Sequence, residues 1–343
     1  MLPARSSRLL LFALLLSTTL LMSLHLILVN RRHALPTSGP PLLAKREANS
    51  SSPSSETGNS TFCPEVAVEF PPELPPLINV TSQVENLMTQ PIINPHFYGY
   101  VHNPRDICSS DKQVDILFVV PSAPENVWKR RKVRKFHQGL YRQLRHYRNT
   151  AVLFFLGIPD SSKPESALAQ ALVCAEVRKY GDIVQENFTD IYHNIRLKAV
   201  SMLRWASSYC PKATYVIRTD DDVLISTNSI IKSIQKIGVY YDNFIVGDVK
   251  KRWNPIRLHS NKYYVSMEEY SNNTYPPFAV GGLLGYPSKT VRLLYEASLR
   301  VRPLWLDDVY ITGICAIEVG AVLLKDAPFR FRHLKEEYLG GVI

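Results

Sequence analysis

The segment Ala213-Thr-Tyr-Val-Ile-Arg218 is followed at once by Thr219-Asp-Asp-Asp222, so a mainly apolar run ends in three aspartates. Short apolar runs that alternate with helical patterns predict an α/β sheet covered by helices. Ligand sites of open α/β sheets lie beyond the carboxyl ends of the strands. We therefore expect the chemistry of this chain to involve Asp220–Asp222.

Further apolar runs on both sides of this segment complete the predicted sheet. We expect strands at residues 114–120, 151–156 and 183–184, and helices at residues 128–148, 164–180, 191–209 and 309–319. Residues 34–110 are rich in proline and serine, so we interpret them as an extended stem that becomes ordered towards its end.

Two acidic groups are candidates for chemistry. The carboxylates of Asp220–Asp222 repel one another unless a cation neutralises them, and hard oxygen ligands suit Mg²⁺ or Mn²⁺. The alternative is an acidic turn that caps the next helix. Asp307 and Asp308 precede the apolar run 309–319, where an acidic pair also fits simple capping of a helix N-terminus.

The net charge of +10, from 40 Lys and Arg against 30 Asp and Glu, favours an anionic partner. Nucleic acid, an anionic membrane surface and a phosphate-bearing substrate all fit this balance. Almost the whole excess lies in one segment without acidic residues, which contains Lys129, Arg130, Arg131, Lys132, Arg134, Lys135, Arg142, Arg145 and Arg148.

An apolar run from Leu9 to Val29 is long enough to span the hydrocarbon core of a bilayer, about 30 Å, as one helix. A cleaved signal peptide is the alternative, but its apolar region is usually shorter. We predict a cytoplasmic tail at residues 1–8, a transmembrane signal anchor at 9–29, a lumenal stem at 30–110 and a catalytic domain at 111–343.

Five N-glycosylation patterns follow the anchor, and this favours a lumenal remainder. They begin at Asn49, Asn59, Asn79, Asn187 and Asn272. A lumenal domain has no access to nucleic acid, which counts against that class of partner. Five cysteines fit an oxidising compartment with at most two internal disulfides and one cysteine left over, and their pairing stays open.

Several motifs follow one another between Asp115 and Gly320. They include Arg131-Lys-Val-Arg134, Phe154-Phe-Leu-Gly157, Lys179-Tyr-Gly-Asp-Ile183, Asn187-Phe-Thr-Asp190, Arg218-Thr-Asp-Asp-Asp-Val223, Lys262-Tyr-Tyr-Val-Ser266, Tyr275-Pro-Pro-Phe278 and Asp307-Asp-Val-Tyr-Ile-Thr-Gly313. In this order they resemble the lumenal β1,3-galactosyltransferases and β1,3-N-acetylglucosaminyltransferases, which are Golgi type II membrane proteins. That family usually has Glu-Asp where this chain has Asp307-Asp308.

The resemblance implies a Rossmann-like GT-A glycosyltransferase domain with a metal-binding DxD-type motif. It implies inverting transfer of a sugar, in the first place galactose, from a UDP-sugar to the 3-hydroxyl of an acceptor glycan on a glycoprotein or glycolipid. The product carries a β linkage. N-Acetylglucosamine and N-acetylgalactosamine are the alternative sugars.

The resemblance also implies roles for individual residues. Asp222 is the expected direct ligand of Mn²⁺ or Mg²⁺, with Asp220 and Asp221 orienting metal waters or the ribose of the donor. Asp308 is the expected base, with Asp307 as the second choice. His333 is a candidate further metal ligand, although a lone histidine also fits a packing role. Arg131 and Arg134 are candidates for the donor side, and Tyr275, Phe278, Gly281 and Gly282 for the acceptor side.

Two other classes of function stay open at this point. A catalytically inactive lumenal chaperone with the same fold would need neither acidic group, and both groups are present. The basic segment 129–148 is also compatible with RNA or heparin binding if it forms a continuous exposed face; otherwise we interpret its remaining cations as a solvated helix face.

Overall fold

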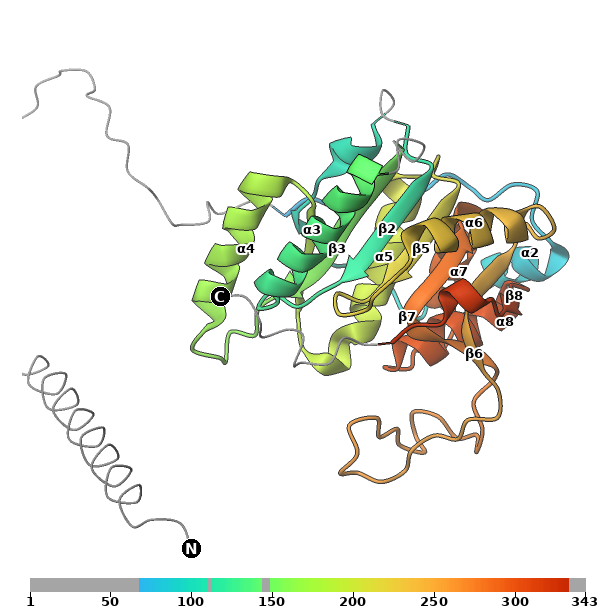
Figure 1. The fold of residues 1–343 in the computed structure, drawn as a ribbon. Helices are drawn as coiled ribbons and strands as arrows, with labels where there is room; N and C mark the ends of the chain where they lie inside the picture. Colours follow the sequence, from blue (N-terminus) through green and yellow to red (C-terminus); the bar gives the residue numbers. More distant parts are fainter. Residues whose placement is uncertain (1–67, 110–112, 144–148, 333–343) are drawn as a thin grey trace, which may run out of the picture. The chain divides into compact units, whose positions relative to one another are not determined.

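A computed structural model describes residues 68–109, 113–143 and 149–332, which form one α/β domain (Figure 1). Its centre is an eight-stranded sheet with the strand order β1-β4-β3-β2-β5-β7-β6-β8. The strands in chain order are β1 Tyr100–His102, β2 Ile116–Pro121, β3 Thr150–Ile158, β4 Ile183–Thr189, β5 Tyr215–Thr219, β6 Phe244–Lys250, β7 Phe278–Pro287 and β8 Val322–Leu324.

Four central strands run in the same direction, and their order defines where a ligand site is expected. β2 pairs in parallel with β3 on one side and with β5 on the other, so Phe118 lies opposite both Val152 and Ile217. β4 continues the parallel set beyond β3. Because the chain first builds outward from β2 through β3 and β4 and then returns to β5, the direction of winding reverses between β2 and β5. Such a reversal point is where open α/β sheets bind ligands.

Helices cover both faces of the sheet, which explains why the central strands are apolar without alternation. Leu117 and Val119 belong to the core on the face covered by α5 Ile195–Tyr209 and α7 Ser288–Arg300. Phe118 and Val120 point to the opposite face. That face is covered by α3 Val127–Gln143, α4 Ser166–Tyr180 and α6 Thr227–Gly238.

The second half of the sheet is mixed rather than parallel. β7 runs antiparallel to both β5 and β6, and β8 pairs in parallel with β6. After α7 the chain forms the π-helix Val309–Cys315 and the short helix α8 Ala316–Glu318. The loop of residues 251–277, between β6 and β7, protrudes from the sheet and is drawn in orange in Figure 1.

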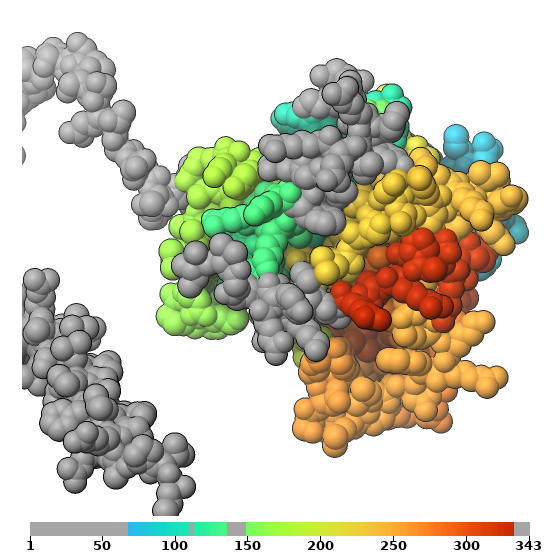
Figure 2. All heavy atoms as spheres, in the orientation of Figure 1, coloured from blue at the N-terminus to red at the C-terminus, as the bar shows by residue number. Residues whose placement is uncertain are grey.

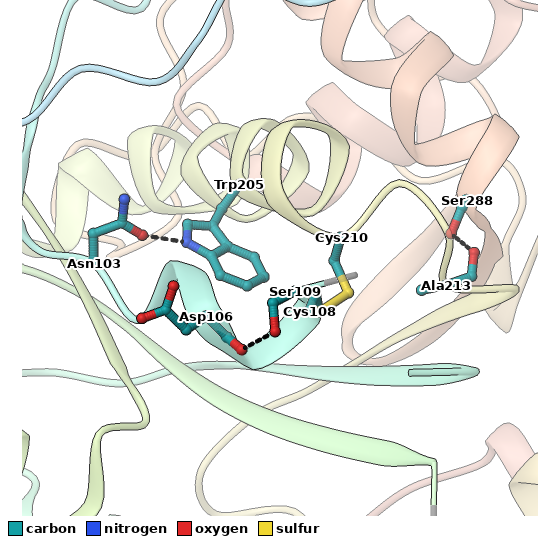
Figure 3. Close-up of a disulfide and its surroundings, with 8 residues drawn as sticks. All are labelled: Asn103, Asp106, Cys108, Ser109, Trp205, Cys210, Ala213 and Ser288. Carbon is teal, nitrogen blue, oxygen red and sulfur yellow. Dashed lines mark hydrogen bonds between the residues drawn. A yellow bond between two sulfur atoms is a disulfide. The ribbon is translucent and has the colours of Figure 1, made fainter. Parts of the chain in front are cut away.

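The structured domain begins well before residue 111. Helix α2 Ser82–Thr89 buries Val84 and Leu87 in the core shared with α7, and β1 pairs antiparallel with β4. The 3₁₀ turn η1 Arg105–Cys108 ends in a disulfide between Cys108 and Cys210 at the end of α5 (Figure 3). Residues 82–108, which the sequence assigned to the stem, are therefore part of the fold.

Several predicted elements differ from the structure in their bounds. The strand expected at 183–184 is seven residues long, because β1 and β3 flank it on both sides. The helix expected at 191–209 is split into a 3₁₀ turn, Tyr192–Asn194, followed by α5. The helix expected at 309–319 is mostly a π-helix. Of the helix expected at 128–148, the structure describes α3 as far as Gln143.

Some expectations concern residues outside the described ranges. Within those ranges no helix is long and apolar enough to cross a membrane. The predicted anchor at 9–29, His333, Asn49 and Asn59 all lie outside them. Among the described cysteines, Cys315 is the free one, and it is buried.

Candidate active site

The three aspartates follow the carboxyl end of β5, as the sequence predicted, and this end lies at the reversal point of the sheet. β5 ends at Thr219, and the residue that follows β2, Ser122, reaches across to Asp221. The Ser122 hydroxyl donates to Asp221 Oδ2 at 2.7 Å, and the side-chain amide of Asn126 donates to the same oxygen at 2.9 Å. These bonds hold Asp221 as a buried carboxylate, whereas the Asp222 side chain is 28% exposed. Asp222 is therefore open to a ligand.

Lys129, in the first turn of α3, supplies a cation to this group. Its ammonium lies 3.0 Å from Asp222 Oδ2 and 3.3 Å from Asp221 Oδ1. Burial alone lowers the pKa of Lys129, but the two carboxylates outweigh burial and raise it. We had interpreted Lys129 as part of a solvated face, and that interpretation was wrong. The position of Lys129 in the sequence could have indicated this contact, because the helix that follows a strand begins at the edge of the sheet where ligands bind.

The second acidic pair is held by an arginine from the strand that carries the first. Arg218, the residue before Thr219, is buried and places Nη1 2.5 Å from Asp307 Oδ2. Its Nη2 lies 3.7 Å from Asp220 Oδ1. Asp308 accepts from the N–H of Val309 at 2.8 Å and so begins the π-helix. The two acidic groups are thus joined through Arg218, and we call their five aspartates, at 220–222 and 307–308, the acidic edge.

Two glycines of β7 lie between the two halves of the acidic edge. The carbonyl of Gly282 accepts from the N–H of Asp220 at 3.1 Å, and the backbone N–H of Gly281 lies near the Asp308 carboxyl and favours its ionised form. A Cβ at Gly281 would lie 2.9 Å from Nη2 of Arg218, so glycine lets the guanidinium approach the strand. Gly281 and Gly282 therefore have a structural role at the site.

Burial and mutual repulsion shift the acids of this edge. Burial, with repulsion from Asp307, raises the pKa of Asp308 to about 7. Burial also raises the pKa of Asp220 to about 6, although the nearby Arg218 opposes the shift. A carboxylate that titrates near neutral pH is well suited to accept a proton.

The residues expected on the donor side are placed differently. Arg134 is buried, and its guanidinium contacts Glu176 at 2.5 Å and Asp182 at 2.7 and 2.8 Å. Arg130 is fully buried and pairs with Glu176 at 2.5 Å, so it is not part of a solvated face as we had supposed. We call these four residues the paired cluster. Arg131 is exposed, and no contact in the described residues joins Arg131 or Arg134 to the acidic edge.

These ion pairs also affect whether the basic helix α3 could bind a polyanion such as RNA or heparin. Arg130 and Arg134 are buried with carboxylates, and Lys129 lies on Asp221 and Asp222. The continuous exposed cationic face that such binding needs is therefore interrupted over this part of α3. The side chains of residues 136–148 are outside the described set.

The residues expected on the acceptor side are mostly packing residues. Tyr275 and Phe278 are buried, with ring centroids 6.2 Å apart. The loop 251–277 instead presents Tyr263, which is 40% exposed. Tyr192 lies near the acidic pair as well. Burial raises its pKa to about 12, and Tyr263, Asp307 and Asp308 add to the shift. Figure 2 shows this loop, in orange, against the red C-terminal segment.

Trp305 joins that loop to the acidic pair two residues further on. Its indole N–H donates to the carbonyl of Tyr264 at 3.1 Å, and its ring stacks on His193 with centroids 4.7 Å apart. Neither Tyr192 nor Trp305 carries a sequence signal for a role at the site, because segments far apart in the chain bring them towards the acidic pair. Of the predicted glycosylation sites, Asn79, Asn187 and Asn272 are exposed.

The acidic edge supplies some, but not all, of the ligands that a divalent metal ion needs. Within the described residues no group of three or more His, Cys, Asp and Glu side chains converges to hold an ion alone. A Mg²⁺ or Mn²⁺ ion bound with a diphosphate, however, takes only one or two carboxylates from the protein. Asp222 is accessible, Asp220 lies two residues before it, and the edge already draws in the ammonium of Lys129. This donor set suits a hard cation shared with phosphate oxygens.

Fold and site together define an α/β domain with an acidic ligand-binding edge at its reversal point. Residues 129–326 match the model of the Galactosyltransferase family. The chain belongs to that family.

Individual relatives carry more detailed names. The chain is 32% identical over 227 residues to a lactosylceramide 1,3-N-acetyl-beta-D-glucosaminyltransferase of Xenopus tropicalis, covering 66% of this chain and 59% of that protein. It is 34% identical over 230 residues to the Homo sapiens protein of the same name, with the same two coverages. It is 28% identical to beta-1,3-galactosyltransferase 1 of Mus musculus, covering 74% of each chain. The match thus spans about 59% of the length of the first two relatives.

Solved structures resemble the chain only remotely. A mannosyltransferase of Pyrobaculum calidifontis in complex with GDP-Man and Mn²⁺ matches with a TM-score of 0.36 and 14% identity, covering 71% of this chain and 62% of that one.

Proposed function

We propose that this protein is a metal-assisted, inverting β1,3-hexosyltransferase that moves a sugar from a UDP-sugar to the 3-hydroxyl of an acceptor glycan. The observation that carries the proposal is the acidic edge. Arg218 joins its two halves by pairing with Asp220 and Asp307. Next to these residues lie the accessible carboxylate of Asp222, just beyond β5, and Asp308, whose pKa is raised to about 7. The β1,3-transferases among the relatives support the same reaction.

In this proposal Asp222 and Asp220 hold the cation, and Asp221 is kept in place by Ser122 and Asn126. A bound Mn²⁺ or Mg²⁺ neutralises negative charge on the diphosphate. The ammonium of Lys129, 3.0 Å from Asp222 Oδ2, would be available to a phosphate oxygen of the donor. The diphosphate of the UDP-sugar then lies beyond the carboxyl ends of β2 and β5.

Asp308 acts on the acceptor. Its ionised carboxylate takes the proton from the attacking 3-hydroxyl, on the face of the sugar opposite the leaving diphosphate, because a single displacement inverts the anomeric carbon. The N–H groups of Val309 and Gly281 orient the carboxylate, and the ion pair between Arg218 and Asp307 holds the turn that carries it. Tyr192 and Tyr263 are exposed on this side of the site and offer aromatic faces to a sugar ring, and the buried Trp305 packs against Tyr192.

Galactose is the donor sugar of this proposal, in keeping with the family description and the murine relative. N-Acetylglucosamine is the second candidate, because the relatives at 31–34% identity carry that sugar in their names. The acceptor is a glycan on a glycolipid or glycoprotein. We further propose a Golgi membrane location with a single-pass type II topology, which the apolar run 9–29 and the exposed Asn79, Asn187 and Asn272 support.

A donor screen tests the proposal. The full-length protein in detergent is incubated with Mn²⁺, a panel of UDP-sugars and acceptors that end in galactose or N-acetylglucosamine, and the products are analysed by mass spectrometry and linkage-specific glycosidases. We expect a β1,3-linked product from one UDP-hexose and none after chelation of the metal. Absence of both transfer and metal-dependent UDP-sugar hydrolysis over the whole panel would instead support an inactive relative.

A further inference from the structure

Arg218 is a buried cation at the centre of the site. In the proposed reaction it makes no direct contact with the donor or the acceptor. Its side chain is 6% exposed, and it is the last residue but one of β5. The guanidinium lies 2.5 Å from Asp307 and 3.7 Å from Asp220, and it rests against the backbone of Gly281. An arginine enclosed in this way cannot reach a donor or an acceptor without breaking its ion pairs.

The contact with Asp307 is the shorter of its two ion pairs, and it acts on the turn that carries Asp308. The Asp308 carboxylate is fixed by the N–H of Val309, next to it in sequence, and it lies near the backbone N–H of Gly281, against which Arg218 packs. Arg218, Gly281 and Asp307 therefore surround Asp308 on the side of the sheet. Moving the guanidinium would move the turn and with it the base.

We propose that the ion pair between Arg218 and Asp307 is a positioning device, which sets the distance between the base Asp308 and the metal-binding end of β5. Arg218 reaches from β5, which ends just before Asp220, to the turn that begins the π-helix. It spans the gap between the cation site and the proton acceptor. The inference rests on the proposed function, because Asp308 is its base.

The test changes the lengths of the two paired side chains. A lysine reaches about one bond less far than an arginine, and a glutamate extends one methylene further than an aspartate, so R218K and D307E change the span in opposite directions. The double variant R218K/D307E restores it approximately. Because a misplacement of about 1 Å near the reacting atoms can slow catalysis about 100-fold, we expect each single variant to lose roughly 10- to 100-fold in kcat.

The four proteins are compared at saturating UDP-sugar and Mn²⁺, with UDP–Mn²⁺ binding measured separately by titration calorimetry. We expect UDP–Mn²⁺ affinity to stay within about threefold in all variants, because Asp222 is untouched, while the double variant recovers at least tenfold in kcat over the slower single variant. If the ion pair had a purely structural role, the variants would change the unfolding temperature, but the double variant would not recover kcat.

Arg300→Lys is the matched control. Arg300 pairs with Glu296 on α7 at 2.6 Å and is as buried as Arg218, but it takes no part in the site. We expect R300K to lower the unfolding temperature and leave kcat unchanged. A double variant no faster than the slower single variant would overturn the inference. So would single variants that lose UDP–Mn²⁺ affinity while keeping kcat. Wild-type protein that transfers no sugar would instead overturn the proposed function, and the inference with it.

Discussion

The paired cluster and the acidic edge both lie against helix α3, and they differ in how far their charges are balanced. The paired cluster has two arginines and two carboxylates, all joined by ion pairs of 2.5–2.7 Å. At the acidic edge, the ion pairs among described residues join two cations, Lys129 and Arg218, to four of the five carboxylates. The carboxylates of the paired cluster are matched by its two arginines, whereas the acidic edge leaves Asp222 partly exposed, where a cation from outside can approach it. The buried arginines of the most basic segment therefore mainly stabilise the fold, and the aspartates of the acidic edge are the groups proposed to act in catalysis.

The strongest test of this contrast is Asp308→Asn. Loss of a general base slows a reaction by roughly 10²–10⁴-fold, so we expect transfer to fall by that factor while secretion and UDP–Mn²⁺ binding stay intact. Turnover close to wild type would show that another group is the base.

The same variant gives a stability readout with a definite sign. Burial raises the pKa of Asp308 to about 7 in the folded protein, against 3.8 for an ordinary aspartate. The charged form is therefore disfavoured in the fold, and wild-type stability falls as pH rises from about 4 to 7. We expect D308N to unfold at a higher temperature than wild type at pH 8, with a smaller difference at pH 5.

Asp222→Ala tests the open end of the acidic edge. We expect loss of transfer and of metal-dependent UDP binding by titration calorimetry, again with normal secretion. Asp242→Ala is the control, because Asp242 pairs with Lys289 at the surface and its removal should change neither quantity. If D222A bound UDP and Mn²⁺ normally, the ligand would have to be another acid of the edge.

Arg134→Leu tests the paired cluster. Removing one partner of a buried ion pair typically costs about 3–5 kcal/mol of stability, so we expect a clear drop in the unfolding temperature. The folded fraction should keep its kcat and its KM for UDP-sugar. Arg131→Leu, at an exposed position, should alter neither. A raised KM in either variant would restore these arginines to the donor side, as the sequence suggested.

The pH profile of transfer tests the shifted carboxylate without mutation. Because Asp308 must be ionised to accept a proton and its pKa is about 7, we expect kcat/KM to rise about tenfold per pH unit below pH 7 and to level off above it. The profile is measured with the metal saturating at every pH. A flat profile between pH 5 and 8 would contradict the assignment.

The smallest expected effect belongs to Lys129→Gln. Lys129 lies on the carboxylate that is proposed to bind the metal, so its removal should tighten Mn²⁺ binding in the absence of donor. A partly exposed charge at this distance contributes on the order of 1 kcal/mol, or about fivefold. Lys132→Gln is the control on the same helix. Weaker Mn²⁺ binding in K129Q would mean that Lys129 orders the acids rather than competing for them.

Much of the fold could be predicted from local pattern, but the contacts across the sheet could not. The run that ends at Asp220 predicted both a strand and its ligand edge, because an apolar strand and the rule of carboxyl ends suffice for that. Burial of Arg130 and Arg134 was missed, since a basic helix gives no sign of which acids face it; Glu176 and Asp182 follow more than forty residues later.

The approach of Arg218 to Asp307 was beyond sequence reasoning for the same reason. It depends on β7 running antiparallel beside β5 and on Gly281 leaving room for the guanidinium. A charged residue inside an apolar strand, two residues before the first of the acids, was nevertheless a signal that such a side chain has a buried partner.

The short strand β1 has a practical consequence for anyone who produces the soluble enzyme. It covers the outer edge of β4, and Glu69 extends this pairing by bridging to Tyr100. A version that starts at the sequence-based boundary of 111 would lose Cys108, uncover the open hydrogen-bonding edge of β4 and invite aggregation between copies. A secreted version should therefore begin upstream of Glu69.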